Sequence, residues 1–136
     1  MNNLPDLPRV INQKEAKFGV IFRRWLMLNK DKFESCTFEL KQTLEYSMPF
    51  SFVDSKQVVY AKRISSDKGT LIRVQGVNGE PDYNFYKNAP SYVVIRFPNW
   101  FYVITMEAFV KERDSSVRKS LTRIRAEAIC LYKQGI

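Results

Sequence analysis

Two apolar segments separated by only two residues place the strongest constraint on the fold. Residues 91–97 read SYVVIRF and residues 100–106 read WFYVITM, and both are rich in the β-branched and aromatic residues that favour strands. Pro98 and Asn99 between them are typical turn residues. The YVVI run has no polar interruption, which is the pattern of a strand covered on both faces. The sequence therefore predicts two joined strands at the centre of a layered domain.

Helical and strand periods alternate along the rest of the chain, which predicts a mixed α/β domain with helices on both sides of a central sheet. Apolar residues recur at helical spacing over 14–28, and residues 33–41 alternate as in a half-buried strand. Asp54 and Gln57 are typical of a capping box at the start of a helix. We further expect a loop at 44–53, a strand at 70–77, a turn at 78–82, a short helix at 107–113 and a final helix at about 120–133.

The length of 136 residues, without linker-like or repeated stretches, predicts a single domain over residues 1–136. Residues 1–13 contain two prolines and no periodicity, so we expect a leader that lies on the surface. No apolar run approaches the ~18 residues of a membrane span, and no signal-peptide pattern is present. We therefore expect an intracellular, cytoplasmic protein.

The chain contains no histidine, and this excludes several classes of active site. Ser-His-Asp triads, Cys-His pairs and zinc sites built on imidazole all require that residue. Cys36 and Cys130 stand alone without metal-ligand spacing, so we expect buried, reduced thiols. The formal net charge of +8 attracts phosphate backbones or anionic membranes. Any catalysis must therefore use carboxylates, lysine, tyrosine or a hard metal ion, and nucleic acid is a candidate partner.

Glu39 and Lys41 lie two residues apart in a predicted strand, so their side chains share one face. The carboxylate can hold a divalent cation, and the carbonyl of Leu40 can offer a further hard ligand to Mg²⁺. A lysine beside such an ion can orient the attacking water or stabilise charge on a scissile phosphate. The simpler interpretation is a surface ion pair worth about 0–1 kcal/mol. Glu15 and Gln57, on the flanking helices, likewise fit a helix N-terminal turn and a capping box.

A set of segments in a fixed order resembles a known nuclease family. The set is Glu15, then FGVIFRRWL, FELKQT, SMPFSFVDSKQ, APSYVVIRFP and RKSLTRIRAEAI. From about Glu15 to Ile129 it resembles the Holliday-junction-resolvase-like branch of the PD-(D/E)xK nuclease superfamily, especially its small phage and prophage members. The resemblance implies a restriction-endonuclease-like fold and an endonuclease that needs Mg²⁺, with Mn²⁺ as a substitute. It further implies a homodimer that cuts branched or duplex DNA, four-way junctions above all, with no small-molecule substrate.

The resemblance also implies roles for four residues. Glu39 would be a metal ligand, and Lys41 would be the catalytic lysine that positions water and phosphate. Glu15 would lie at the edge of the site as an outer or additional acid for the metal ion. Gln57 would contact water or the DNA backbone.

The superfamily usually supplies one more aspartate, from the strand just before the ExK motif. The acids available for that position are Asp31 and Glu34, and Asp82 is an alternative because a carboxylate on a neighbouring strand can reach the same ion. We favour Asp82 over Asp31. Because metal sites depend strongly on the number of ligands, a catalytically inactive nucleic-acid-binding module on the same fold is an alternative function.

Basic residues form two groups that we expect to contact DNA phosphates without reading bases. The first group is Lys14, Lys17, Arg23, Arg24, Lys30 and Lys32, and the second is Arg118, Lys119, Arg123, Arg125 and Lys133. Solvated helix faces explain such runs equally well. Attachment of the first helix to a membrane surface is a weaker hypothesis, because Phe22 and Trp25 are more simply explained as core residues.

Five further aromatic residues have two interpretations: Phe50, Phe52, Tyr83, Phe85 and Tyr86. They can stack on exposed bases at a branch point. Core packing is the favoured interpretation, because aromatic residues in alternating strands usually point inward.

Overall fold

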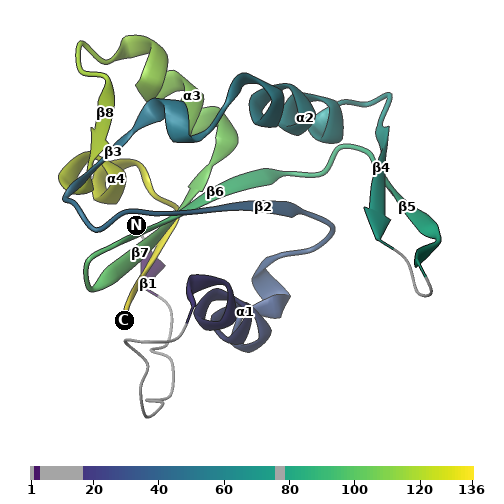
Figure 1. Cartoon of the computed structure of the whole chain (residues 1–136), viewed down its shortest axis with the longest axis horizontal. Coiled ribbons are helices and arrows are strands. Elements are labelled where there is room, and N and C mark those ends of the chain that lie inside the picture. The colour runs from purple at the N-terminus through teal and green to yellow at the C-terminus, as the bar shows by residue number, and fades with distance from the viewer. Residues whose placement is uncertain (1, 4–16, 76–78) are drawn as a thin grey trace.

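The computed structural model describes residues 2–3, 17–75 and 79–136, and a mixed five-stranded sheet lies at its centre (Figure 1). The strand order is β1-β9-β7-β6-β2, in which β1 and β2 pair in parallel with their neighbours and the other pairs are antiparallel. The sheet strands are β1 (Asn2–Asn3), β2 (Thr37–Gln42), β6 (Ser91–Phe97), β7 (Trp100–Thr105) and β9 (Tyr132–Gly135). The other elements are α1 (Phe18–Leu28), η1 (Lys30–Lys32), β3 (Ser47–Pro49), η2 (Phe50–Phe52), α2 (Ser55–Ser65), β4 (Thr70–Gln75), β5 (Pro81–Tyr86), α3 (Met106–Ser115), β8 (Ser120–Thr122) and α4 (Arg123–Ile129).

The two apolar segments form the central hairpin that the sequence predicts. β6 and β7 pair antiparallel with Phe97 opposite Trp100. Asn99, in the turn between them, has a φ of +69°, a conformation that asparagine adopts more readily than most residues. Val93, Val94 and Ile95 of β6 are fully buried. The prediction that this strand is covered on both faces is therefore confirmed.

Each face of the sheet has its own core, because side chains alternate along β6 and β7. On one face α1 contributes Phe22 and Trp25, whose rings pack against Phe101. On the other face α2, α3 and α4 cover a second core that contains Tyr102 and Phe109 (Figure 1). The mixed α/β class with helices on both faces is thus confirmed, and so is the core position of Phe22 and Trp25.

Two predicted boundaries in the first half of the chain are wrong. The strand predicted at 33–41 begins only at Thr37, because Ser35 has a φ of +45° and this left-handed conformation interrupts extended backbone. The loop predicted at 44–53 contains β3 and η2, because β3 pairs with the distant β8. The first helix is described from Phe18, and the part of the prediction over 14–16 lies outside the described residues.

The helix predicted at about 120–133 is wrong at both ends. β8 occupies its first turn, and the Thr122 hydroxyl accepts a hydrogen bond from the Arg125 N–H as the N-cap of α4. Beyond α4 the N–H of Leu131 donates to the Val103 carbonyl at 2.7 Å, and β9 then pairs with β7. Pairing with the edge of β7 therefore overrides the local helix propensity of this segment.

Of the leader predicted over residues 1–13, the structure describes residues 2–3. Asn2 and Asn3 form β1 and pair in parallel with Tyr132 and Lys133 of β9. The rest of the leader expected over 1–13 lies outside the described residues.

β4 and β5 form a separate two-stranded arm that extends from the end of α2 (Figure 1). β4 confirms the strand predicted at 70–77 as far as Gln75, whereas β5 already begins within the turn predicted at 78–82. Gly69, just before the arm, has a φ of +78°, and a Cβ there would lie 2.5 Å from the Phe85 ring. Only glycine fits this close approach, so it determines how the arm leaves the domain.

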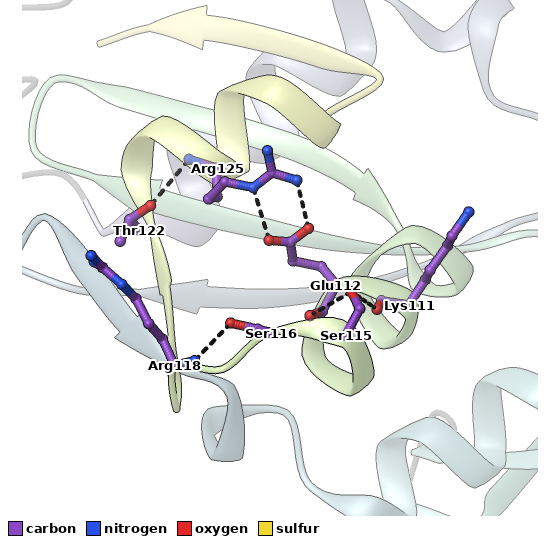
Figure 2. A network of polar contacts seen from close by, with 7 residues as sticks. All are labelled: Lys111, Glu112, Ser115, Ser116, Arg118, Thr122 and Arg125. Carbon is purple, nitrogen blue, oxygen red and sulfur yellow. Dashed lines mark hydrogen bonds and ion pairs between the residues drawn. The ribbon is translucent and has the colours of Figure 1, made fainter.

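A bidentate ion pair joins α3 to α4 (Figure 2). The Arg125 Nε and Nη2 groups donate to Glu112 Oε2 and Oε1 at 2.9 and 2.8 Å. The hydrogen bonding from Arg125 lowers the pKa of the Glu112 carboxyl, against the opposing effect of burial. The pair therefore stabilises the fold more when Glu112 is ionised.

Glu112→Gln is expected to lower the melting temperature modestly at pH 7 and to have a clearly smaller effect at about pH 3. A carboxyl whose pKa is lower in the folded state contributes stability above its unfolded pKa, and this contribution is lost as the pH falls through the folded pKa. The effect is modest because the Arg125 side chain is 55% exposed. Thermal unfolding at the two pH values measures it. An equally large difference between the two proteins in acid would contradict the assignment.

Candidate functional site

β2 is an edge strand of the sheet and turns two charged side chains toward α2. Phe38 and Leu40 pack into the core beneath α1. Glu39 and Lys41 alternate with them and therefore face the opposite side. The shared face that the sequence predicts for the two charged residues is thus observed.

The backbone of β2 also presents a carbonyl at this edge. The N–H of Thr37 donates to the Pro90 carbonyl, and the N–H of Thr43 donates to the Arg96 carbonyl. Because alternate residues of a strand bond to the same neighbour, the polar groups of Leu40 point away from β6. Within the described part of the chain, no strand pairs with that side of β2. The Leu40 carbonyl is therefore directed to the open edge.

Two side chains hold the Glu39 carboxylate. Lys41 Nζ lies 3.3 Å from Glu39 Oε1, and Gln57 Nε2 donates a hydrogen bond of 2.5 Å to the same oxygen. The side chains of Lys41 and Glu39 are 21% and 34% exposed. Both contacts use Oε1, so Oε2 is the oxygen that can meet a cation. The carboxylate is therefore oriented by the protein and still accessible.

Gln57 connects this pair to the first turn of α2. The Asp54 carboxylate accepts from the Gln57 N–H at 2.9 Å, and Gln57 Oε1 accepts from the Asp54 N–H at 3.0 Å. This is the capping box that the sequence predicts. Because its oxygen is held by the cap, the amide directs its nitrogen to Glu39. The same side chain therefore starts the helix and orients the carboxylate.

A groove of about 560 Å³ opens beside Glu39 and Gln57. Its wall is formed by residues of β2, β6, α2 and the arm, together with Met106 of α3. On its surface the Thr37 and Ser91 hydroxyls share a hydrogen bond of 2.9 Å. Tyr60 from α2 lines this groove, and so do Leu71, Arg73, Tyr83 and Tyr86 from the arm.

The other acids predicted for the site are not brought to Glu39 in the described part of the chain. Glu15 lies outside the described residues. Asp82 is exposed on β5 and does not line the groove. Asp31 is exposed in η1, and Glu34 is exposed before β2 begins. Among residues 2–3, 17–75 and 79–136, no group of three or more acidic or cysteine side chains is arranged to hold a metal ion.

The first basic group lies mainly on the other side of the sheet. Arg23 and Arg24 are exposed on α1, which covers the face opposite Glu39 (Figure 1). Lys30 and Lys32 are exposed in η1, which follows α1. These side chains are accessible to phosphate, but Arg23 and Arg24 do not border the groove.

Three members of the second basic group have partners within the protein. Arg123 Nη1 donates to the Tyr102 hydroxyl at 3.0 Å. Arg125 is paired with Glu112. Lys133 Nζ lies 3.1 Å from Glu127 Oε1. Arg118 and Lys119 are exposed between α3 and β8. These two are therefore the members of the group best placed for phosphate contacts.

The preference for core packing holds for only part of the aromatic set. Phe50 is buried, in contact with Phe109. Phe52, Tyr83 and Phe85 are exposed instead. The arm explains the difference for Tyr83 and Phe85, because its two strands form a sheet of their own apart from the central one.

Sequence reasoning missed several residues of the groove, among them Tyr60, Leu71 and Arg73. The spacing of Gln57 and Tyr60 already places them on one face of a helix. No local pattern indicates Arg73, because its position depends on how the arm folds against α2.

Neither cysteine is a candidate nucleophile. Burial raises the pKa of the Cys36 thiol, and burial is also the main cause that raises the pKa of Cys130 to about 11. Both thiols are therefore protonated near neutral pH, which disfavours attack and metal binding. The predicted burial holds for Cys130, whereas Cys36 is only partly buried, and both are free thiols in the structure.

In the described residues, every helix is too short or too polar to cross a bilayer. Comparisons of the chain with protein-family models, with curated proteins and with solved structures found no match.

Proposed function

We propose that the chain is a metal-dependent endonuclease that hydrolyses phosphodiester bonds in branched DNA, with the four-way junction as its main substrate. The observation that carries the proposal is the cluster of Glu39, Lys41 and Gln57 on an open strand edge beside a groove. The mixed sheet with helices on both faces is compatible with a restriction-endonuclease-like fold. A homodimer would present two such sites to two DNA strands.

The oxygen donors of β2 suit Mg²⁺. This ion usually keeps several waters and binds one or two protein carboxylates together with substrate phosphates. Glu39 Oε2 and the Leu40 carbonyl would hold it, and Mn²⁺ would substitute. Glu15 lies outside the described residues and stays a prediction as an additional ligand. When bound, such an ion polarises the phosphoryl oxygen and lowers the pKa of a bound water.

The chain's own residues have distinct tasks in this proposal. The Lys41 ammonium, 3.3 Å from Glu39, would orient the attacking water and stabilise negative charge on the phosphate. Gln57 would keep the carboxylate in one orientation, so that the ligand need not reorganise during the reaction. The exposed cations of η1, Lys30 and Lys32, together with Arg118 and Lys119, would bind the DNA backbone without reading its sequence.

One observation favours the inactive DNA-binding module as a second candidate. Among the described residues, Glu39 belongs to no group of three or more acidic or cysteine side chains that could hold a metal ion, and a metal site with fewer ligands binds its ion more weakly. Tight binding to DNA that weakens steeply with salt, without cleavage, would characterise this function.

The proposal is tested by incubating the protein with a labelled four-way junction, with a linear duplex of equal length as the control. Cleavage of the junction is expected in Mg²⁺ or Mn²⁺ and not in EDTA, and the duplex should be cut more slowly. Salt-sensitive binding of the junction without cleavage in either metal would favour the binding module instead.

A further inference from the structure

The arm and α2 turn exposed aromatic rings toward the groove that contains Glu39. Tyr60 of α2 and Tyr83 of β5 line the groove, and the two residues are 50% and 58% exposed. Tyr86 and Leu71 line it as well. Large apolar surface that borders a cavity in this way is typical of a binding site.

These tyrosines differ from the aromatic residues of the α1 core. There Trp25 packs against Phe22 and Phe101 with centroid distances of 5.6 and 5.2 Å. Among the described residues, Tyr60 and Tyr83 take part in no ring-to-ring contact. No other aromatic ring therefore competes for them, and both residues are at least half exposed to a planar partner.

The size and polarity of the groove limit what that partner is. Its volume of about 560 Å³ lies within the ~300–1,000 Å³ of pockets that hold small ligands. Glu39 and Gln57 provide polar groups on the β2 and α2 sides, and Arg73 provides a positive charge on the arm. Aromatic walls beside a cation suit a nucleotide, whose base is planar and whose phosphate is negative.

We propose that this groove binds an unpaired nucleobase of the DNA strand whose phosphate lies at Glu39. Tyr60 and Tyr83 stack on the base, and Arg73 contacts a neighbouring phosphate. The inference rests on the proposed function, because it takes DNA as the ligand. A base inside a duplex is stacked between its neighbours, so only a single-stranded or extruded base can enter. The groove therefore favours DNA in which a nucleotide next to the cleavage point is unpaired, or is extruded at a branch point.

The test compares binding to two labelled DNAs in EDTA, so that no cleavage occurs. One is a duplex with a short single-stranded gap, and the other is the fully paired duplex of equal length. The double variant Tyr60→Leu/Tyr83→Leu removes both rings, and Tyr60→Phe/Tyr83→Phe keeps them. Tyr46→Leu is the matched control, because Tyr46 is exposed after β2 and does not line the groove.

The double leucine variant is expected to lose roughly 5- to 150-fold in affinity for the gapped DNA, the range for one stacked base, and to bind the paired duplex as before. The phenylalanine variant and Tyr46→Leu should keep the preference for the gap. Equal affinities of the leucine variant and the unchanged protein for the gapped DNA would overturn the inference, and so would an equal loss on both DNAs.

Binding in EDTA also separates this inference from the proposed hydrolysis. One outcome is that the unchanged protein prefers the gapped DNA but never cuts DNA, and that the double leucine variant loses this preference. The groove assignment then stands and the nuclease proposal fails. If the protein cuts junctions and the ring variants bind the gap as before, the nuclease proposal stands and the groove assignment fails. Full competition by a free nucleoside monophosphate, without any gap preference, would assign the groove to a mononucleotide and overturn the role in DNA.

Discussion

Glu39→Gln is expected to lower the rate of junction cleavage in Mg²⁺ by about 10³-fold or more. The substitution removes the negative oxygen that would hold the cation, and a catalytic metal ion contributes several kcal/mol to stabilising the transition state, at about 1.4 kcal/mol per tenfold in rate. Glutamine keeps the size of the side chain, and its amide oxygen can still accept the hydrogen bond from Gln57. Single-turnover cleavage of a labelled four-way junction measures the effect.

The loss of activity should occur without loss of the fold. Glu39 and Lys41 are 34% and 21% exposed, and an ion pair of this kind contributes at most about 1 kcal/mol to stability. The melting temperature of Glu39→Gln should therefore lie close to that of the unchanged protein. Glu45→Gln is the matched control for charge, because Glu45 is exposed just beyond β2. An equal cleavage rate for Glu39→Gln and Glu45→Gln would show that the proposed mechanism is wrong.

Lys41→Met separates the role of the lysine from that of the carboxylate. Methionine keeps an unbranched apolar stem and removes the ammonium group. We expect the rate at saturating Mg²⁺ to fall by about 10²- to 10³-fold, the range for one lost group that stabilises developing charge. The Mg²⁺ concentration that gives half of the maximal rate should change little. Lys111→Met on α3, whose side chain extends away from the Glu112–Arg125 pair (Figure 2), is the matched control.

The cluster of Glu39, Lys41 and Gln57 could be predicted because each of its parts depends on a local pattern. Alternation along residues 37–42 determines the face of the two charges, and the capping box determines where α2 begins. What joins the parts is the turn from β2 through β3 and η2 into α2. The sequence predicts only a loop there, because the partner of β3 lies more than seventy residues later.

Asp82 and the aromatic residues of the arm show why the rest could not be predicted. The sequence places Asp82 in a turn near a neighbouring strand, but β5 pairs with β4 and leaves the central sheet. Whether a strand joins the central sheet or forms an arm depends on tertiary contacts, and no local residue pattern records this. The face of the sheet that α1 covers, and with it the position of the basic residues on α1, likewise depends on tertiary packing and not on a local pattern.

Trp25 belongs to the core that packs beneath β2. Trp25→Ala is expected to lower the free energy of unfolding by about 3–5 kcal/mol, a large part of the 5–15 kcal/mol that is typical of a domain. Trp25 is fully buried, and its ring packs against Phe22, Phe33 and Phe101 at centroid distances of 5.6, 5.7 and 5.2 Å. Alanine would leave a cavity that these rigid rings fill only partly. Urea unfolding followed by fluorescence or circular dichroism measures the change.

Met27→Ala is the matched control on the same helix, because Met27 is 62% exposed and such a change usually stays within about 0.5 kcal/mol. The comparison also bears on the site. Phe33 packs on Phe38 at 5.4 Å, and Phe38 precedes Glu39, so the aromatic core supports the strand that carries the carboxylate. Trp25→Ala should therefore reduce cleavage by more than its unfolded fraction at the assay temperature. Equal stabilities of the two alanine variants would show that this core does not hold β2 in place.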